Sequence, residues 1–103
     1  MNKVKEYLDN KLNDAIEIIK AHNLEYEKVG IFGSYARGDY NGSSDIDIVM
    51  IFKELPPRYK TADLRWDLEP IDVDYTVLLE STFNNPKTVF QKEVVRDFKE
   101  IIL

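Results

Sequence analysis

The chain has 103 residues, of which 44% are apolar, and its 14 basic and 19 acidic side chains give a net charge of −5. This length predicts a single domain over residues 1–103, with one modest core and little room for a separate substrate-binding domain. The negative charge disfavours nucleic acid as a partner, because sequence-independent binding to nucleic acid requires a cationic surface.

The composition and the N-terminus also bear on the compartment. The sequence contains no cysteine, which excludes disulfides and thiolate metal sites. The N-terminal stretch MNKVKEYLDNK has neither the apolar region nor the cleavage site of a signal peptide. No run of residues approaches the roughly 18 apolar positions that a membrane span requires. We therefore expect a cytoplasmic protein that does not enter a membrane.

The first part of the chain predicts a helix followed by a short strand. In residues 3–22, apolar side chains recur every three or four positions, which is typical of a helix that covers a sheet. Residues 27–32 are rich in branched and aromatic side chains and predict a strand that stops at Gly33-Ser34. After this turn, residues 35–37 can form one helical turn, and Gly38 suits the left-handed conformation that ends it.

A second strand carries two acids. Asn41-Gly42 marks a tight turn, and the segment 45–52, DIDIVMIF, follows it. Alternation places Asp45 and Asp47 on one face of this strand, and the same face becomes apolar after these two residues. We therefore expect the strand to be buried on both faces further along, with its acids where it begins.

A helix and a third strand are expected after Pro56-Pro57. The helix is predicted over residues 59–69. Its inward side chains are predicted to be Tyr59, Ala62, Trp66 and Leu68. Residues 71–79, IDVDYTVLL, then alternate as a strand, with Asp72 and Asp74 on a shared face. Alternation alone does not distinguish these two acids from each other.

The C-terminal part predicts one loop and one last helix. Residues 81–85 are expected to form the loop, and Asn85-Pro86 suits the N-cap and first position of the helix. The apolar stripe of this helix is predicted to comprise Phe90, Val94, Phe98 and Ile101. The apolar end of the chain, residues 101–103, is either part of the core or a surface for a partner.

The pair of Asp45 and Asp47 indicates a metal-binding site. Aspartate is depleted in strands, and two carboxylates on one face repel each other more strongly as water is excluded. A divalent cation relieves this repulsion, and Mg²⁺ favours carboxylate oxygens together with phosphates and water. A third acid from the 71–79 strand would complete a two-metal cluster, which can stabilise the attacking and leaving oxygens of a phosphoryl displacement.

The turn Gly33-Ser34 has the features of a phosphate-binding element. Glycine lets the backbone approach a phosphate closely, backbone N–H groups that open a helical turn favour an anion, and Ser34 adds a hydroxyl donor. Arg37 has two possible roles, pairing with phosphate or bracing an aspartate, and the sequence does not decide between them. Because Asp45 and Asp47 follow after a gap of ten residues, the pattern predicts a site for a nucleoside triphosphate and a divalent metal.

These residues resemble the polymerase-β-like nucleotidyltransferase superfamily. Its pattern is a Gly-Ser turn, a gap of about this length, an Asp-x-Asp pair and a third acid on a following strand. Within it, GSYARGD at 33–39 and SDID at 44–47 look like the minimal nucleotidyltransferases, the MNT antitoxins of HEPN/MNT toxin–antitoxin pairs. The resemblance covers residues 29–79, and the last helix is not part of it.

The resemblance implies an α/β fold of the mixed α+β kind, the polymerase-β-like palm, in which helices flank a mixed sheet. Asp45 and Asp47 match the two metal-binding carboxylates, and Asp74 fits the position of the third. Gly33 and Ser34 match the turn that contacts the triphosphate. The resemblance also implies ATP as the donor, Mg²⁺ as the cofactor, and transfer of AMP to a tyrosine of a HEPN-type toxin, which would be the partner.

Two other functions are compatible with parts of this pattern. An antitoxin with a vestigial site would neutralise its partner by masking it, but a vestigial site has no need to keep the Gly-Ser turn, the Asp-x-Asp pair and a third acid. An enzyme that modifies a small molecule such as an antibiotic, or that extends RNA, usually needs an added substrate domain. A chain of 103 residues has little room for one, and its negative charge further disfavours RNA.

Overall fold

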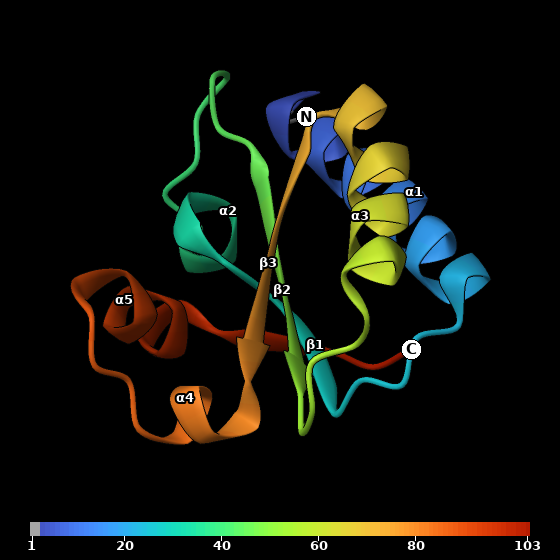
Figure 1. Ribbon diagram of the computed structural model, residues 1–103. Coiled ribbons are helices and arrows are strands. Elements are labelled where there is room, and N and C mark those ends of the chain that lie inside the picture. The colour runs from blue at the N-terminus through green and yellow to red at the C-terminus, as the bar shows by residue number, and fades with distance from the viewer. Residues whose placement is uncertain (1–2) are drawn as a thin grey trace.

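A four-stranded mixed sheet forms the centre of the computed structural model, which describes residues 3–103 (Figure 1). The strands are β1 (Lys28–Phe32), β2 (Ile46–Phe52), β3 (Val73–Leu79) and β4 (Lys99–Ile101), in the order β3-β2-β1-β4. β1 is antiparallel to both of its neighbours, whereas β2 and β3 are parallel. The expected mixed sheet with flanking helices is therefore confirmed.

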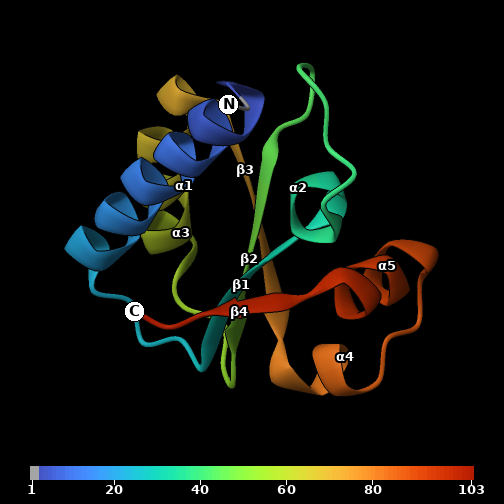
Figure 2. The same ribbon diagram turned by 180° about the vertical axis from the view of Figure 1, so that it is seen from behind.

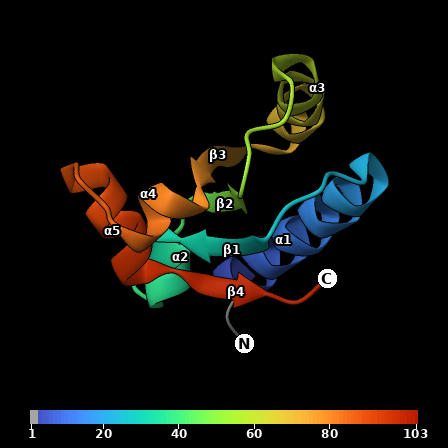
Figure 3. The same cartoon turned by 60° about the horizontal axis from the view of Figure 1, so that its bottom comes forward.

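Helices cover both faces of the sheet. They are α1 (Lys3–His22), α2 (Gly33–Arg37), α3 (Arg58–Leu68), the 3₁₀ helix η1 (Glu69–Ile71), α4 (Glu80–Asn84) and α5 (Val89–Asp97). α1 and α3 lie on one side of the sheet, whereas α4 and α5 lie on the other with α2 beside α5 (Figures 2 and 3). α3 connects the parallel strands β2 and β3, as parallel pairs require a crossover segment. None of the described helices has an apolar stretch of membrane-spanning length.

β2 is the central element of the core because both of its faces are buried. Under α1 and α3, Ile46, Ile48, Met50 and Phe52 of β2 pack with aliphatic side chains of these helices. On the other face, Val49 and Ile51 pack with Phe32 and with Val94 of α5. The prediction that this strand is buried on both faces beyond its acids is confirmed.

The inward face predicted for α3 is wrong. Trp66 and Tyr59 are 76% and 65% exposed, and Ala62 is also exposed, whereas Leu64 and Leu68 are fully buried. Leu64 and Leu68 are four residues apart and so share one side of the helix, and Trp66, two residues from each, lies roughly 200° around it. The helix therefore has two apolar stripes, and the crossover places the aliphatic one against the sheet. Of the predicted inward residues, only Leu68 is buried.

The third strand is shorter than predicted. Glu69–Ile71 forms a 3₁₀ turn that contains Pro70, and Asp72 has a left-handed backbone with φ 54°. β3 therefore begins at Val73 instead of at residue 71. The proline and the left-handed aspartate end the crossover, which removes Asp72 from the strand and leaves Asp74 on it.

The C-terminal prediction needs three corrections. The expected loop at 81–85 is largely the helix α4, and α5 begins after Thr88 instead of after Asn85. Thr88 and Gln91 form a capping box, which satisfies backbone donors at the start of the helix. α5 ends at Asp97, so Phe98 follows the helix and Ile101 lies in β4. Ile101 packs against the core, while Ile102 is 85% exposed.

β4 can approach β1 closely because residue 30 is glycine. A Cβ atom built on Gly30 would overlap the ring of Phe98 and the backbone oxygen of Lys99. We predict that Gly30→Ala lowers the free energy of unfolding by about 1–3 kcal/mol, as overpacking of a core does. Chemical denaturation measures this change. Gly42→Ala is the matched control because its Cβ meets no atom within 4 Å, and an equal loss in both variants would contradict the prediction.

Candidate active site

Three side chains form a row across the sheet where β2 begins. In the strand register, Phe32 of β1 lies opposite Asp47 of β2, and Asp47 lies opposite Asp74 of β3. Asp47 is half-buried and Asp74 is exposed. Two carboxylates from different strands are thus brought together on the face that also carries the start of α2.

The strand register decides between Asp72 and Asp74, a choice that alternation left open. Asp74 lies within β3 beside Asp47, whereas Asp72 precedes the strand in the left-handed backbone conformation. Asp45 stands just before β2 and is exposed. It lines an acidic hollow of about 180 Å³ together with Asp74, Asp72 and Glu69. The geometry therefore favours Asp74 as the third acid, next to Asp45 and Asp47.

The Gly33-Ser34 turn is fitted to Asp47. Gly33 has φ 79°, a left-handed conformation that strains other residues, and it begins the short helix α2. A Cβ atom at this position would overlap a carboxylate oxygen of Asp47. The glycine is therefore required twice, by its backbone conformation and by the carboxylate that occupies the space of a side chain.

The protonation of Asp47 reflects this crowded setting. Burial raises the pKa of Asp47 to about 6, and the negative charges of Asp74 and Asp45 and a hydrogen bond with Asp74 contribute in the same direction. The positive charge of Arg37 acts in the opposite direction but does not outweigh these effects. The three acids are thus close enough for their charges to interact, and the charge of Arg37 does not neutralise their mutual repulsion.

The donor chemistry of these acids fits a hard divalent cation. Carboxylate oxygens are the ligands that Mg²⁺ prefers, and a cation would relieve the repulsion that raises the pKa of Asp47. Within residues 3–103, no three His, Asp or Glu side chains are already arranged as a metal-binding group. Binding would therefore require Asp45, Asp47 and Asp74 to turn their carboxylates toward a common point.

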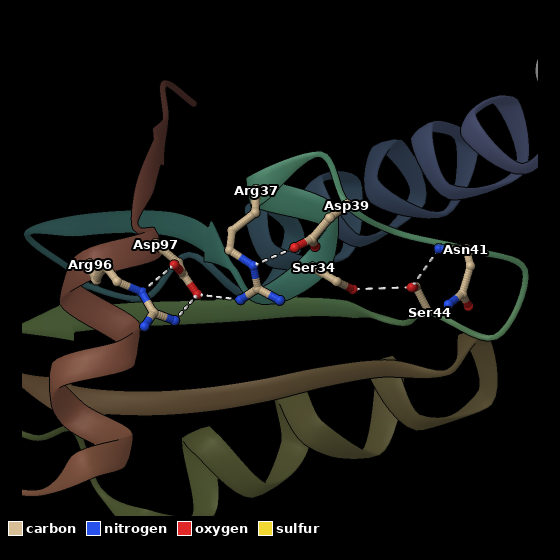
Figure 4. Close-up of polar contacts among 7 residues, drawn as sticks. All are labelled: Ser34, Arg37, Asp39, Asn41, Ser44, Arg96 and Asp97. Carbon is tan, nitrogen blue, oxygen red and sulfur yellow. Dashed lines mark hydrogen bonds and ion pairs between the residues drawn. The ribbon is translucent and has the colours of Figure 1, made fainter.

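Ser34 is hydrogen-bonded to the loop that precedes Asp45. Its hydroxyl donates to Oγ of Ser44 at 3.1 Å, and Ser44 Oγ also accepts from the backbone N–H of Asn41 at 2.9 Å (Figure 4). Ser44 immediately precedes Asp45. These bonds link the Gly-Ser turn to the end of the loop from which the acids emerge.

Arg37 braces aspartates in this structure, which is one of the two roles that the sequence left open. Its Nη1 donates to Asp97 at 2.7 Å and its Nε donates to Asp39 at 3.1 Å (Figure 4). Asp97, at the end of α5, has only 4% of its side chain exposed and also accepts from Nε of Arg96 at 2.9 Å. These partners hold the pKa of Asp97 below its usual value. Arg37 therefore fixes α2 to α5.

A hollow of about 340 Å³ opens beside the acids. Its lining combines the row across the sheet with residues from α3 and α5: Phe32, Asp47, Asp74, Thr76, Arg65 and Phe90 are among them. Phe90 packs edge-on against Phe32, with 5.9 Å between ring centroids. The hollow thus offers carboxylates, an arginine and two aromatic rings to a ligand.

Sequence reasoning did not find Asp97, Phe90 or Arg65 as neighbours of the site. Asp97 lies 60 positions after Arg37 in the chain, and no local pattern marks such a pair. The sequence places Phe90 in the apolar stripe of the last helix, and in the structure its side chain is 48% exposed. A signal for Asp97 does exist in the adjacent Arg96, since an Arg-Asp pair at a helix end can form an ion pair.

The fold and these side chains together define an enzyme that transfers nucleotidyl groups. The chain belongs to the polymerase β nucleotidyltransferase family, whose model matches residues 2–103. The superfamily expected from the Gly-Ser and Asp-x-Asp pattern is thereby confirmed.

Relatives and solved structures agree with this family. The chain is 39% identical over 66 residues to the candidate protein adenylyltransferase MJ1215 of Methanocaldococcus jannaschii, covering 58% of this chain and 77% of the relative. It is 35% identical over 66 residues to the protein adenylyltransferase MntA of Thermococcus cleftensis, covering 58% and 67%. A candidate nucleotidyltransferase structure from Sulfolobus solfataricus superposes with a TM-score of 0.63 at 27% identity, covering 95% and 82%.

The fold is also that of an antitoxin solved with its toxin. The structure of a tri-AMPylated Shewanella oneidensis HEPN toxin in complex with an MNT antitoxin matches with a TM-score of 0.57 at 20% identity. The match covers 90% of this chain and 70% of that chain. At this identity, the likeness shows the fold.

The fit between Gly33 and Asp47 predicts a difference between two glycines. Gly33→Ala and Gly38→Ala each place a side chain at a positive φ, so each variant should lose about 1–2 kcal/mol of stability. Only Gly33→Ala also displaces the Asp47 carboxylate, and a misplacement of about 1 Å can cost roughly 100-fold in rate. Nucleotidyl transfer at saturating substrate measures the difference. Equal rates in the two folded variants would contradict this prediction.

The depressed pKa of Asp97 predicts a pH-dependent stability. A carboxylate with a lowered pKa contributes stability above its unfolded-state pKa, and the contribution is lost as the pH falls through its folded-state pKa. We expect Asp97→Asn to lose about 2 kcal/mol at pH 7, because it removes the charged acceptor of two arginines. The difference from wild type should shrink in strongly acidic buffer.

Denaturant unfolding at neutral and acidic pH measures this effect. Asp63→Asn is the control, since Asp63 is exposed on α3, and it should change stability little at either pH. A loss in Asp97→Asn that is the same at every pH would show that the carboxylate charge is not responsible.

Proposed function

We propose that this chain is a Mg²⁺-dependent protein adenylyltransferase that moves AMP from ATP to a hydroxyl of a partner protein. The acceptor that we favour is a tyrosine of a HEPN-type toxin, so that the chain acts as its antitoxin. The single observation that carries the proposal is the register of Asp47 and Asp74 beside the Gly33-Ser34 turn. Relatives named as protein adenylyltransferases support the choice of AMP and of a protein acceptor.

Each site residue has a proposed role. Asp45, Asp47 and Asp74 would hold Mg²⁺, and two ions fit the number of carboxylates. When bound, the metal supplies positive charge to the phosphates and lowers the cost of the charge that develops during transfer. Gly33 and Ser34 would contact the triphosphate, with Gly33 giving close backbone access and Ser34 a hydroxyl donor.

The reaction is an in-line displacement at the α-phosphorus of ATP. The acceptor oxygen forms a bond to the α-phosphorus, the bond from that phosphorus to the bridging oxygen breaks, and pyrophosphate leaves with the electron pair. The hydroxyl proton passes to the exposed carboxylate of Asp74, which lies next to Asp47 in the register. Catalysis of this kind depends mainly on positioning and on stabilisation of charge. We place the protein in the cytoplasm, where ATP and such a partner would meet it.

Arg37 has a positioning role in this proposal. Its guanidinium group is bonded to Asp97 and Asp39, so it holds α2 in place and need not contact phosphate. Its positive charge still favours the ionised form of Asp47. Arg37 therefore supports the site through its geometry and through its field.

Asp47→Asn is the direct test of the catalytic role. The variant keeps the size of the side chain and should fold, but the loss of a metal-binding carboxylate should cost several kcal/mol of barrier. This corresponds to a fall in rate on the order of a thousandfold. The assay incubates the chain with ATP, Mg²⁺ and the HEPN-domain protein of the same organism, and intact mass detects AMP on the partner.

Two controls define the result. Asp14→Asn, which changes an exposed aspartate on α1, should transfer AMP at the wild-type rate. Transfer by Asp47→Asn at nearly that rate would sink the mechanism. If an Asp45→Asn/Asp47→Asn double variant still neutralises the toxin fully, the chain acts by masking its partner and not by modifying it.

A further inference from the structure

The outer face of α3 exposes aromatic side chains that the fold does not use. Trp66 is 76% exposed and Tyr59 is 65% exposed, and Leu55, just before the helix, is 57% exposed. The helix already packs on the sheet through Leu64 and Leu68, on its other side. Tyr59 and Trp66 of the second apolar stripe belong to neither core cluster. Exposed tryptophan and tyrosine are typical of protein interfaces.

Two arginines lie on the same surface. A hollow of about 420 Å³ is lined by Arg58, Arg65 and Trp66, and Glu69 also lines it. Within residues 3–103, neither arginine forms an ion pair, and the guanidinium of Arg65 lies 5.6 Å from the ring centre of Tyr75. In a chain of net charge −5, these two arginines beside Glu69 are cations that can pair with carboxylates of an acidic partner.

This surface is continuous with the candidate active site. Arg65 and Glu69 line the hollow beside Trp66, and they also line the hollow that contains Asp47 and Asp74. α3 lies at the periphery of the fold on the β3 side of the sheet (Figure 3). Arg65 and Glu69, which line both hollows, therefore connect the surface around Trp66 with the acids at the β3 edge of the sheet.

We propose that the outer face of α3, formed by Arg58, Tyr59, Arg65 and Trp66, docks an acidic surface of the protein that accepts the nucleotidyl group. Trp66 and Tyr59 provide the apolar anchor, and the arginines pair with carboxylates of that protein. The docked protein then presents its hydroxyl past Arg65 to Asp47 and Asp74. The inference rests on the proposed function, since it names the surface through which that acceptor is selected.

The test compares binding of a protein with modification of a small acceptor. The protein probe is the purified HEPN-domain protein of the same organism, and the small acceptor is tyrosinamide, which is too small to need the α3 surface. The variants are Trp66→Ala and Arg58→Glu. Val89→Ala on α5 is the matched control, because Val89 is as exposed as Trp66, at 76%.

Trp66→Ala should weaken binding of the protein roughly 30-fold, as expected for an aromatic hot spot. Arg58→Glu should weaken it about tenfold, with a smaller effect in high salt because exposed charges are screened. Val89→Ala should bind within about twofold of wild type, and Trp66→Ala should transfer AMP to tyrosinamide within about twofold of wild type.

Three outcomes separate the hypotheses. Unchanged binding by Trp66→Ala, or no binding by wild type, overturns the docking surface. If Trp66→Ala instead converts a dimer of this chain into monomers while partner binding is kept, the face joins two copies and the proposal is wrong. If wild type modifies neither acceptor but binding depends on Trp66, the docking surface stands and the proposed function fails.

Discussion

The contact between Gly33 and Asp47 is the constraint on which the site depends. The Asp47 carboxylate occupies the space that a Cβ of residue 33 would fill, and the positive φ of Gly33 lets α2 begin at that point. Because Asp47 also lies in register with Phe32 and Asp74, the turn and the three strands share one fixed position. A slip of one residue in either strand pair would turn the carboxylate away from this face.

The C-terminal segment, through β4 and α5, also holds the Gly33-Ser34 turn in place. β4 pairs with β1 through the gap that Gly30 leaves, and β1 ends at the Gly33 turn. α5 contributes the buried Asp97, which accepts a hydrogen bond from Arg37. Arg37 lies about one helical turn after Ser34. The pairing of β4 with β1 and the bond between Arg37 and Asp97 each join residues that are far apart in the sequence. The C-terminal segment, which lies outside residues 29–79 where the motifs occur, therefore holds the Gly33-Ser34 turn in place.

Local patterns predicted the parts of this molecule that short-range physics decides. The Gly-Ser turn and the Asp-x-Asp strand followed from glycine chemistry and alternation, whereas the mixed sheet was implied by the family resemblance. Alternation could not separate Asp72 from Asp74, because the choice depends on a left-handed residue after Pro70. The buried face of α3 was missed because the aromatic stripe with Trp66 is as regular as the aliphatic one.

Charge balance connects the site with the surface beside it. Arg37 is the cation that acts on Asp47, yet its guanidinium is already bonded to Asp97 and Asp39. A bound cation would relieve the remaining repulsion among the acids, and a ligand that binds only the folded state also stabilises that state. Within the described residues, Arg65 forms no ion pair, and its guanidinium lies near the ring of Tyr75. Its positive charge is therefore available to a ligand. In the proposed function, the acids would hold the cation that accompanies the triphosphate, whereas Arg65 would pair with a carboxylate of the acceptor protein, so groups of opposite charge in one region would bind different parts of the two substrates.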